Sequence, residues 1–209
     1  MSFYLISPPI ESKNFNLENF KKIIELIDVK YLQLRPKYKN DKNNKNFIIN
    51  NFKTFNKICR TKNIKLIVND DIFLAQELGT DGVHVGQNDL NCKSVREILG
   101  PSFIIGVSCN NSVTLAQNAK QDGANYVAFG PVFKSQTKHS NSKLVDIENL
   151  RKKKKQIPLP FTLIGGINHN NIEKLRGFGF DSISVIQSIW NYKNGPVKSA
   201  RKFNELGFK

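Results

Sequence analysis

The chain has 209 residues, of which 39% are hydrophobic, so it is long enough to bury a substantial core within one domain. Lys and Arg total 32 against 17 acidic residues, a formal net charge of +15. This charge indicates an anionic partner such as a phosphate ester, unless it reflects a general bias of the chain toward Lys, Asn, Ile and Phe. The composition shows no break along the sequence, and residues 1–209 are therefore predicted to form a single domain.

The cysteines and the N-terminal segment exclude several other classes of protein. Cys59, Cys92 and Cys109 form no C-x-x-C pair, which argues against a disulfide framework and against a zinc site. A reducing, cytoplasmic location is the simplest expectation. The first apolar run ends at Pro8 and is too short for a signal peptide or a membrane span, so no membrane partner is expected.

Strand-like runs alternate with segments of helical period from one end of the chain to the other. The predicted strands are residues 3–6, 31–35, 66–69, 82–86, 103–108, 126–130, 161–165 and 182–186. In the first two intervals, apolar residues three or four positions apart predict amphipathic helices over 17–27 and 47–58. This alternation favours the α/β class and a single-domain (β/α)8 TIM barrel. A doubly wound open sheet is the alternative, because the sequence does not show whether the sheet closes.

Three polar segments fall between the predicted strands. Residues 133–143 are polar and basic and follow the sixth strand, so they are expected on the rim, where they could close over an anion. The Lys- and Asn-rich stretch 38–45 is expected to be a solvated connection. Residues 151–155, Arg-Lys-Lys-Lys-Lys, are interpreted as the solvated face of an outer helix, because no nucleic-acid motif accompanies them. No nucleic-acid partner is therefore expected.

Two aspartates stand at the ends of neighbouring strands. Asp70 follows the third predicted strand, and Asp89 closes the Gly-Gln-Asn-Asp segment after the fourth. In a parallel sheet the carboxyl ends of all strands lie on one side, so the two carboxylates are expected to meet at one rim. Oxygen ligands without Cys or His beside them favour Mg²⁺ over zinc.

The second strand ends in Gln33, Arg35 and Lys37, which an extended chain would point in one direction. An Arg and a Lys together suit a diphosphate, although polar residues can also simply fill a barrel interior. Gly165–Gly166 and residues 186–188 follow the last two strands, where (β/α)8 proteins often bind phosphate through backbone N–H groups.

These segments resemble those of the thiamine-phosphate synthase (thiamine-phosphate pyrophosphorylase) family. The matching blocks occur in order over nearly the full chain: YLIS at 4–7, QLRPK at 33–37, ND at 69–70, GVHVGQNDL at 82–90, IGVS at 105–108, YVAFGPVF at 126–133, TK at 137–138 and IGGI at 164–167. The resemblance implies a barrel enzyme of thiamine biosynthesis, a transferase with small-molecule substrates. It would join 4-amino-2-methyl-5-(diphosphooxymethyl)pyrimidine to a phosphorylated hydroxyethyl-methylthiazole, giving thiamine phosphate and diphosphate.

The resemblance also implies roles for individual residues. Asp70 and Asp89 would hold Mg²⁺ against the diphosphate. The pyrimidine diphosphate would be contacted by Gln33, Arg35, Lys37, Asn69 and Lys138, with Ser108 beside the reacting pyrimidine; Arg35, Lys37, Lys138 and Ser108 form the predicted catalytic set. The thiazole phosphate would be surrounded by Ser135, Gln136, Thr137, Gly166, Ile186 and Gln187. A homo-oligomer is compatible with this interpretation.

Some positions depart from the family pattern. Ser135 stands where Thr is usual, Lys134 where Pro is usual, and Gln187 where Ser is commoner, which puts a side-chain contact to the thiazole phosphate in doubt. Asn110 stands where His is frequent. The related thiazole tautomerases use a His near this point, so Asn110 favours a synthase over a tautomerase. A non-catalytic barrel that binds phosphorylated ligands is a further alternative. His84 is interpreted as a packed or hydrogen-bonded core residue, and Cys109 is expected near the site.

Overall fold

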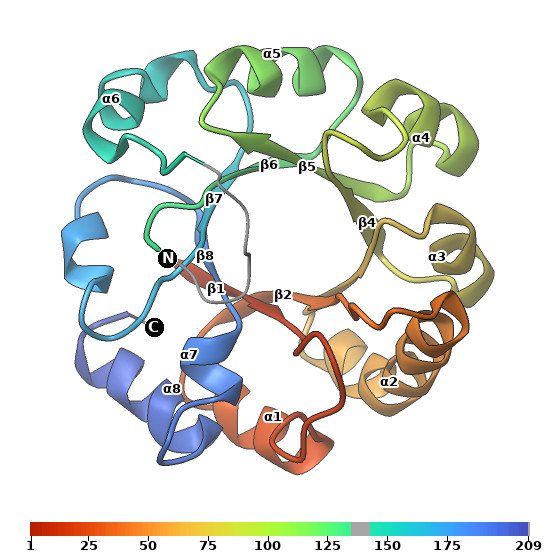
Figure 1. Ribbon diagram of the computed structural model, residues 1–209, viewed down its shortest axis with the longest axis vertical. Helices are drawn as coiled ribbons and strands as arrows, with labels where there is room; N and C mark the ends of the chain where they lie inside the picture. Colours follow the sequence, from red (N-terminus) through yellow and green to blue (C-terminus); the bar gives the residue numbers. More distant parts are fainter. Residues whose placement is uncertain (135–142, 209) are drawn as a thin grey trace.

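The computed structural model describes residues 1–134 and 143–208. Eight parallel strands form a closed barrel in sequence order, and the pairing of β1 with β8 closes it. The strands are β1 (Ser2–Ile6), β2 (Val29–Leu34), β3 (Lys65–Asn69), β4 (Gly82–Val85), β5 (Ile104–Asn110), β6 (Tyr126–Phe129), β7 (Phe161–Ile164) and β8 (Ser182–Val185). Closure confirms the TIM barrel and excludes the open sheet. Figure 1 looks along the barrel and shows the ring of strands inside a ring of helices.

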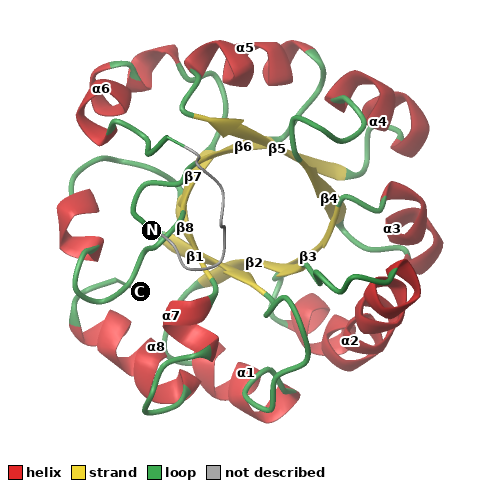
Figure 2. Ribbon diagram, in the orientation of Figure 1, coloured by secondary structure: helices red, strands yellow, loops and turns green. Residues whose placement is uncertain are grey.

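Helices cover the outside of the barrel (Figure 2). They are α1 (Leu17–Ile24), α2 (Asp41–Thr61), α3 (Ile72–Leu78), α4 (Cys92–Leu99), α5 (Val113–Gln121), α6 (Ile147–Lys152), α7 (Gln187–Trp190) and α8 (Pro196–Glu205), with 3-10 helices at Lys154–Gln156 and Ile172–Leu175. The unit after β7 differs from the expected regular alternation. It contains only the second 3-10 helix, and Gly177 and Gly179 follow it with positive φ angles of 73° and 74°. No helix within the described residues is both long and apolar enough to cross a membrane.

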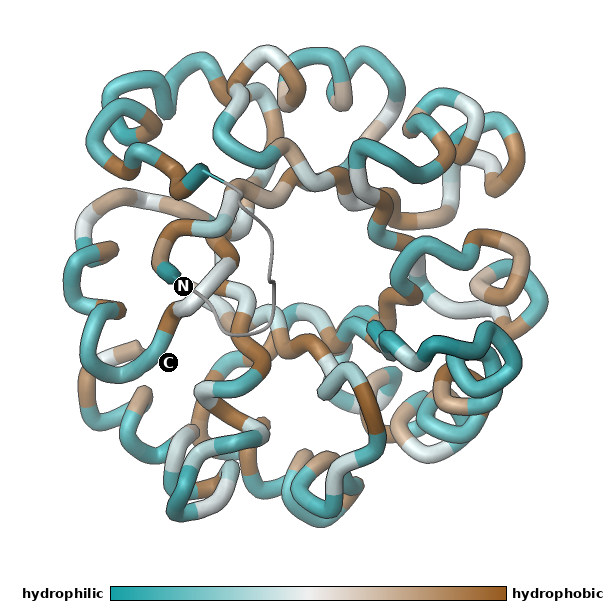
Figure 3. Tube along the Cα trace, in the orientation of Figure 1, coloured by the Kyte–Doolittle hydropathy of each residue, from teal (hydrophilic) through white to brown (hydrophobic). Residues whose placement is uncertain are grey.

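Two apolar clusters fill the molecule, one on each face of the sheet. Phe3 and Leu5 of β1 pack outward against the helices, whereas Tyr4 and Ile6 point into the barrel. The outer face of the strands is therefore apolar under the helices, whereas the interior face mixes aromatic and aliphatic residues with buried polar ones such as Gln33, His84 and Thr162. In the hydropathy colouring, apolar and polar segments alternate along the outer helices, as amphipathic helices require, and the ring of strands carries both apolar and neutral colour (Figure 3).

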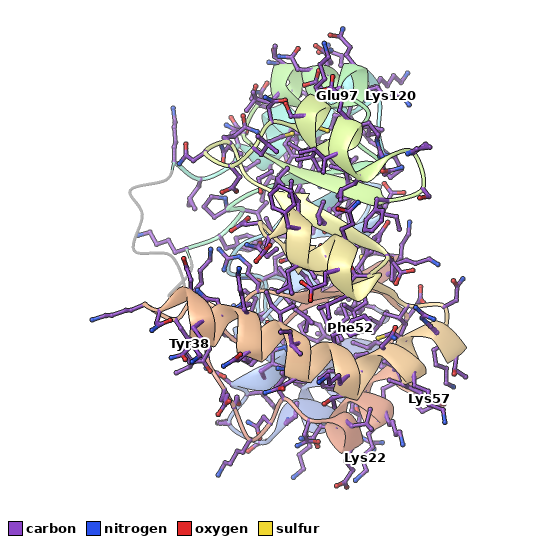
Figure 4. The ribbon with its side chains drawn as sticks, turned by 90° about the vertical axis from the view of Figure 1, so that its right-hand side faces the viewer. Lys22, Tyr38, Phe52, Lys57, Glu97 and Lys120 are labelled. Atoms are coloured by element: carbon purple, nitrogen blue, oxygen red, sulfur yellow. The ribbon has the colours of Figure 1, made fainter. Side chains whose placement is uncertain are left out.

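The outer faces of the helices carry much of the charge. Lys22, Lys57, Glu97 and Lys120 are exposed and are labelled on the helices in Figure 4. The basic run at 152–155 is exposed too, on α6 and the 3-10 helix that follows it, which agrees with its interpretation as a solvated face.

The expectation for residues 38–45 was wrong in part. This stretch is largely exposed, but α2 begins at Asp41 within it, so it is not simply a connection. The side chain of Asn40 accepts a hydrogen bond from the backbone N–H of Lys42 and caps the helix. The polar first turns of α2 lack the apolar periodicity that identifies its second half, which is why the pattern located the helix too late.

Candidate functional site

A large cleft opens at the carboxyl ends of the strands, with a volume of about 1390 Å³. Its lining contains the predicted residues Gln33, Arg35, Lys37, Asn69, Asp70, Asp89, Ser108, Gly166, Ile186 and Gln187. Residues from β2 through β8 thus converge on one cavity, as the common polarity of parallel strands requires. Ser135, Gln136, Thr137 and Lys138 lie outside the described residues.

The two aspartates lie close to each other in this cleft. Asp70 directly follows β3 and adopts a left-handed φ of 64°, with its backbone N–H donating to the carbonyl of His84 at 3.0 Å. The carboxylate of Asp89 accepts a hydrogen bond from the backbone N–H of Gly86 at 2.7 Å. Burial is the main cause of a raised pKa at Asp70; Lys37 opposes the shift, and the charge of Asp89 adds to it. The left-handed backbone and the paired carboxylates mark Asp70 and Asp89 as candidate functional residues.

Positive side chains face this acidic pair from the end of β2. The ammonium of Lys37 lies 3.2 Å from a carboxylate oxygen of Asp70. The Arg35 backbone N–H donates to Ser7 Oγ at 2.8 Å, which fixes the chain where it leaves the strand. Burial lowers the pKa of the Arg35 guanidinium, while Asp70 and Asp89 raise it. The cleft therefore holds oxygen ligands for a cation beside cationic groups for an anion, the combination needed to bind a metal diphosphate.

The acidic pair fits Mg²⁺ better than a metal held by protein alone. Within residues 1–134 and 143–208, no group of three or more His, Cys, Asp or Glu side chains could hold a metal ion. Mg²⁺ commonly takes one or two carboxylates and completes its octahedral shell with water and substrate phosphate oxygens. Asp70 and Asp89 supply that number of carboxylates.

A buried hydrogen-bonded network lies directly below these charges. Gln33 Nε2 donates to the hydroxyl of Tyr4 at 3.1 Å, and that hydroxyl lies 2.7 Å from the hydroxyl of Tyr126. His84 connects the network to the cleft, because its Nδ1 lies 3.0 Å from Tyr126 Oη and its Nε2 lies 2.9 Å from Ser108 Oγ. Burial, followed by the charge of Arg35, lowers the pKa of His84 to about 4, so its imidazole is neutral at pH 7.

The far side of the cleft is built from glycines and the start of α7. Gly165 and Gly166 have φ angles of 104° and 66°, which disfavour other residues. A Cβ at Gly166 would lie 2.3 Å from the carbonyl oxygen of Lys134, and one at Gly165 would lie 2.5 Å from Cβ of Pro131. The β7 end therefore needs both glycines for the close approach of the segment that follows β6.

The structure changes the interpretation of several residues. Cys109 was expected near the site, but it points away from the cleft into the core outside the barrel, because it alternates with Ser108 along β5. Burial raises its pKa to about 12. The core assignment of His84 agrees with its burial, but the sequence did not reveal its contact with Ser108. Lys193 also lines the cleft, although the sequence analysis did not predict it as a site residue. It follows no predicted strand directly and lies in none of the segments that resemble the family.

The fold and the cleft define a (β/α)8 barrel protein with a polar, charged cleft at the carboxyl ends of its strands. Residues 3–189 match the family model described as thiamine monophosphate synthase. The chain belongs to this family, and its predicted membership is confirmed.

Named relatives agree with the family assignment. The chain is 40% identical over 149 residues to a thiamine-phosphate synthase of Methylococcus capsulatus. The matched region covers 71% of this chain and 64% of the relative, so it spans slightly less than two thirds of the relative's length. It is 36% identical over 201 residues to a thiamine-phosphate synthase of Pelagibacter ubique, covering 95% of this chain and 94% of the relative. A solved thiamine phosphate pyrophosphorylase from Pyrococcus furiosus has a TM-score of 0.81 and 25% identity, covering 98% and 94% of the two chains.

Proposed function

We propose that this chain is a Mg²⁺-dependent thiamine-phosphate synthase. It would couple the diphosphorylated aminopyrimidine to the phosphorylated hydroxyethyl-methylthiazole and release diphosphate. The observation that carries the proposal is the meeting of Asp70 and Asp89 with Arg35 and Lys37 in one cleft of a chain that belongs to this family. The cleft volume of about 1390 Å³ exceeds that of most single-ligand pockets and supports the binding of two substrates.

The proposed reaction breaks a C–O bond and forms a C–N bond. The departing diphosphate gains negative charge, which Arg35 and Lys37 are placed to stabilise. Mg²⁺ held by Asp70 and Asp89 would neutralise part of the same charge when bound. The electron-rich aminopyrimidine supports positive charge on its methylene carbon, and the thiazole nitrogen attacks that carbon without needing a side-chain base. This agrees with the neutral His84, whose Nδ1 lies against the hydroxyl of Tyr126 and not against a carboxylate, so His84 and Ser108 do not form a Ser/His/Asp triad.

Each substrate has an expected place in the cleft. The pyrimidine diphosphate would lie near Gln33, Asn69 and Ser108, with its phosphates toward the acidic pair. The thiazole phosphate would lie at the opposite wall, which Gly166 and Gln187 line and where backbone N–H groups could contact it. Ser135, Gln136 and Thr137 are predicted to contact the thiazole phosphate and Lys138 the pyrimidine diphosphate, but all four lie outside the described residues.

The reaction itself tests this proposal. Purified protein is incubated with the pyrimidine diphosphate, the thiazole phosphate and Mg²⁺, and diphosphate and thiamine phosphate are measured while each component is omitted in turn. Formation of both products only in the complete mixture would support the synthase. Isomerisation of a thiazole carboxylate phosphate without diphosphate release would instead indicate the tautomerase, and binding without any turnover would indicate the non-catalytic barrel.

A matched pair of variants tests the metal assignment. Asp70→Asn is expected to lower kcat by at least about a hundredfold, because it removes one charged ligand of the cation. Asn tolerates the left-handed φ of 64° at this position, so the fold should survive. Asp71→Asn is the control: the Asp71 side chain caps α3 through the N–H of Leu74 at 3.0 Å, and Asn caps equally well. Equal activity of the two variants would refute the role of Asp70.

A further inference from the structure

The hydrogen-bonded network below the cleft is a single chain of donors and acceptors. It runs from Gln33 through Tyr4, Tyr126 and His84 to Ser108, with no branch at the three interior members among the described residues. Tyr4 and Tyr126 are almost fully buried. A tyrosine hydroxyl carries one hydrogen, so each can donate only once. The donor-to-acceptor direction of every hydrogen bond in the network therefore follows from the direction of the bond at one end.

Gln33 sets that direction at the barrel wall. Its Nε2 donates to the Tyr4 hydroxyl, whose own hydrogen then has the oxygen of Tyr126 as its acceptor. The hydrogen of Tyr126 is left for Nδ1 of His84. With Nδ1 as an acceptor, the neutral imidazole carries its hydrogen on Nε2 and donates it to Ser108 Oγ.

We infer that Tyr4 and Tyr126 are positioning residues that hold His84 in its Nε2–H tautomer, so that Ser108 directs its hydroxyl hydrogen into the cleft. The Ser108 hydroxyl has no other partner among the described residues, and Ser108 lines the cleft. Its ligand is thus a hydrogen-bond acceptor, such as a ring nitrogen or a phosphate oxygen. This identification of the ligand rests on the proposed function; the tautomer rests on the protein alone.

The opposite arrangement conflicts with the Gln33 amide as it lies in the structure. If His84 carried a hydrogen on Nδ1, in the other neutral tautomer or in the charged form, Tyr126 would have to accept it and donate to Tyr4. The hydrogen of Tyr4, at a side chain that is 1% exposed, would then point at Gln33 Nε2, which is itself a donor. Two donors facing each other in a buried site are costly, which favours the direction set by the Gln33 amide as it lies.

The packing around Tyr126 fixes the position of its ring and therefore of its hydroxyl in the network. A Cβ at Gly106 would lie 2.0 Å from Cζ and 2.2 Å from Oη of Tyr126, so the ring occupies space that only a glycine leaves free. The ring of Tyr31 stacks on that of Tyr126, with centroids 5.1 Å apart and an angle of 25° between the planes. Tyr31 makes no side-chain hydrogen bond to the described residues of the network, so its role is packing.

Histidine NMR tests the inference without substrate. Protein labelled with ¹⁵N in its histidines is examined at pH 7.5 by long-range ¹H–¹⁵N correlation, and the pattern that disappears in His84→Asn is assigned to His84. The expected pattern shows Nε2 protonated and Nδ1 unprotonated. The Nδ1–H pattern would overturn the inference, because Gln33 would then present its carbonyl to Tyr4 and Ser108 would offer an acceptor.

Two tyrosine variants extend the test to function. Tyr126→Phe removes the donor to Nδ1 and should give a mixture of His84 tautomers, with kcat reduced about tenfold and KM little changed. Tyr31→Phe removes a hydroxyl from the same aromatic cluster and should leave both the tautomer and kcat unchanged. An unaltered Nε2–H pattern in Tyr126→Phe would overturn the positioning role. If the wild-type protein forms no thiamine phosphate, the proposed function fails, but the NMR results still decide the tautomer.

Discussion

Replacing Gly106 by alanine should distort the barrel interior more than its size suggests. The added Cβ would lie 2.0 Å from Tyr126 Cζ, far inside van der Waals contact. The Tyr126 ring cannot move away freely, because its hydroxyl bonds Tyr4 at 2.7 Å and His84 at 3.0 Å. Overpacking costs about 1–3 kcal/mol and two lost hydrogen bonds cost roughly 1 kcal/mol each, so the free energy of unfolding should fall by about 3–5 kcal/mol.

Urea unfolding at neutral pH measures this loss, with the midpoint and the slope fitted together. Gly177→Ala is the control, since Gly177 has a φ of 73° and nothing within 4 Å of an added Cβ. Gly177→Ala should lower the free energy of unfolding only by the cost of a left-handed backbone at a residue with a Cβ, about 1–2 kcal/mol. The comparison separates the clash from a general effect of replacing glycine.

A double-mutant cycle identifies the clashing partner. Leucine lacks the outer ring atoms of tyrosine, so in a Tyr126→Leu background Gly106→Ala should cost less than about 1 kcal/mol. A clash with Tyr126 would be ruled out if Gly106→Ala were no more destabilising than Gly177→Ala, or if Gly106→Ala cost the same free energy of unfolding in both backgrounds.

Three further predictions concern stability, pH and substrate binding. Trp190→Phe should lower the free energy of unfolding in urea by about 2–3 kcal/mol, because the buried indole donates to the carbonyl of Ile6 at 2.8 Å. The pKa of His84 is about 4 in the folded protein against an ordinary 6.5, so the unfolded chain binds more protons between these values and stability should fall with falling pH. His84 contributes up to about 1.4 kcal/mol per pH unit, a slope that His84→Asn should lose in urea titrations between pH 4.5 and 7. Gly166→Ala should raise KM for the thiazole phosphate in steady-state assays, since its Cβ would displace the carbonyl of Lys134.

The sequence predicted the eight strands of the barrel and the polar residues that follow their carboxyl ends. All eight strands appear close to their expected bounds, because each is a short segment with apolar residues at least at alternate positions, buried on its outer face by the helices and bounded by polar loops. The convergence of Asp70, Asp89 and Arg35 followed from one rule, the common polarity of parallel strands. Where local signals were weak the prediction was poorer, as in the polar first turns of α2 and the 3-10 helix before β8.

Only the tertiary structure decided which side chains meet inside the barrel. Tyr4 and Tyr126 are separated by 122 positions, yet their hydroxyls lie 2.7 Å apart because closure brings their strands around a common interior. The register between the neighbouring strands β4 and β5 brings Ser108 to His84, and alternation along β5 leaves Cys109, one residue later, on the outer face. Strand period and strand polarity are local properties that a sequence carries, whereas contact across the barrel depends on the stagger with which the sheet closes.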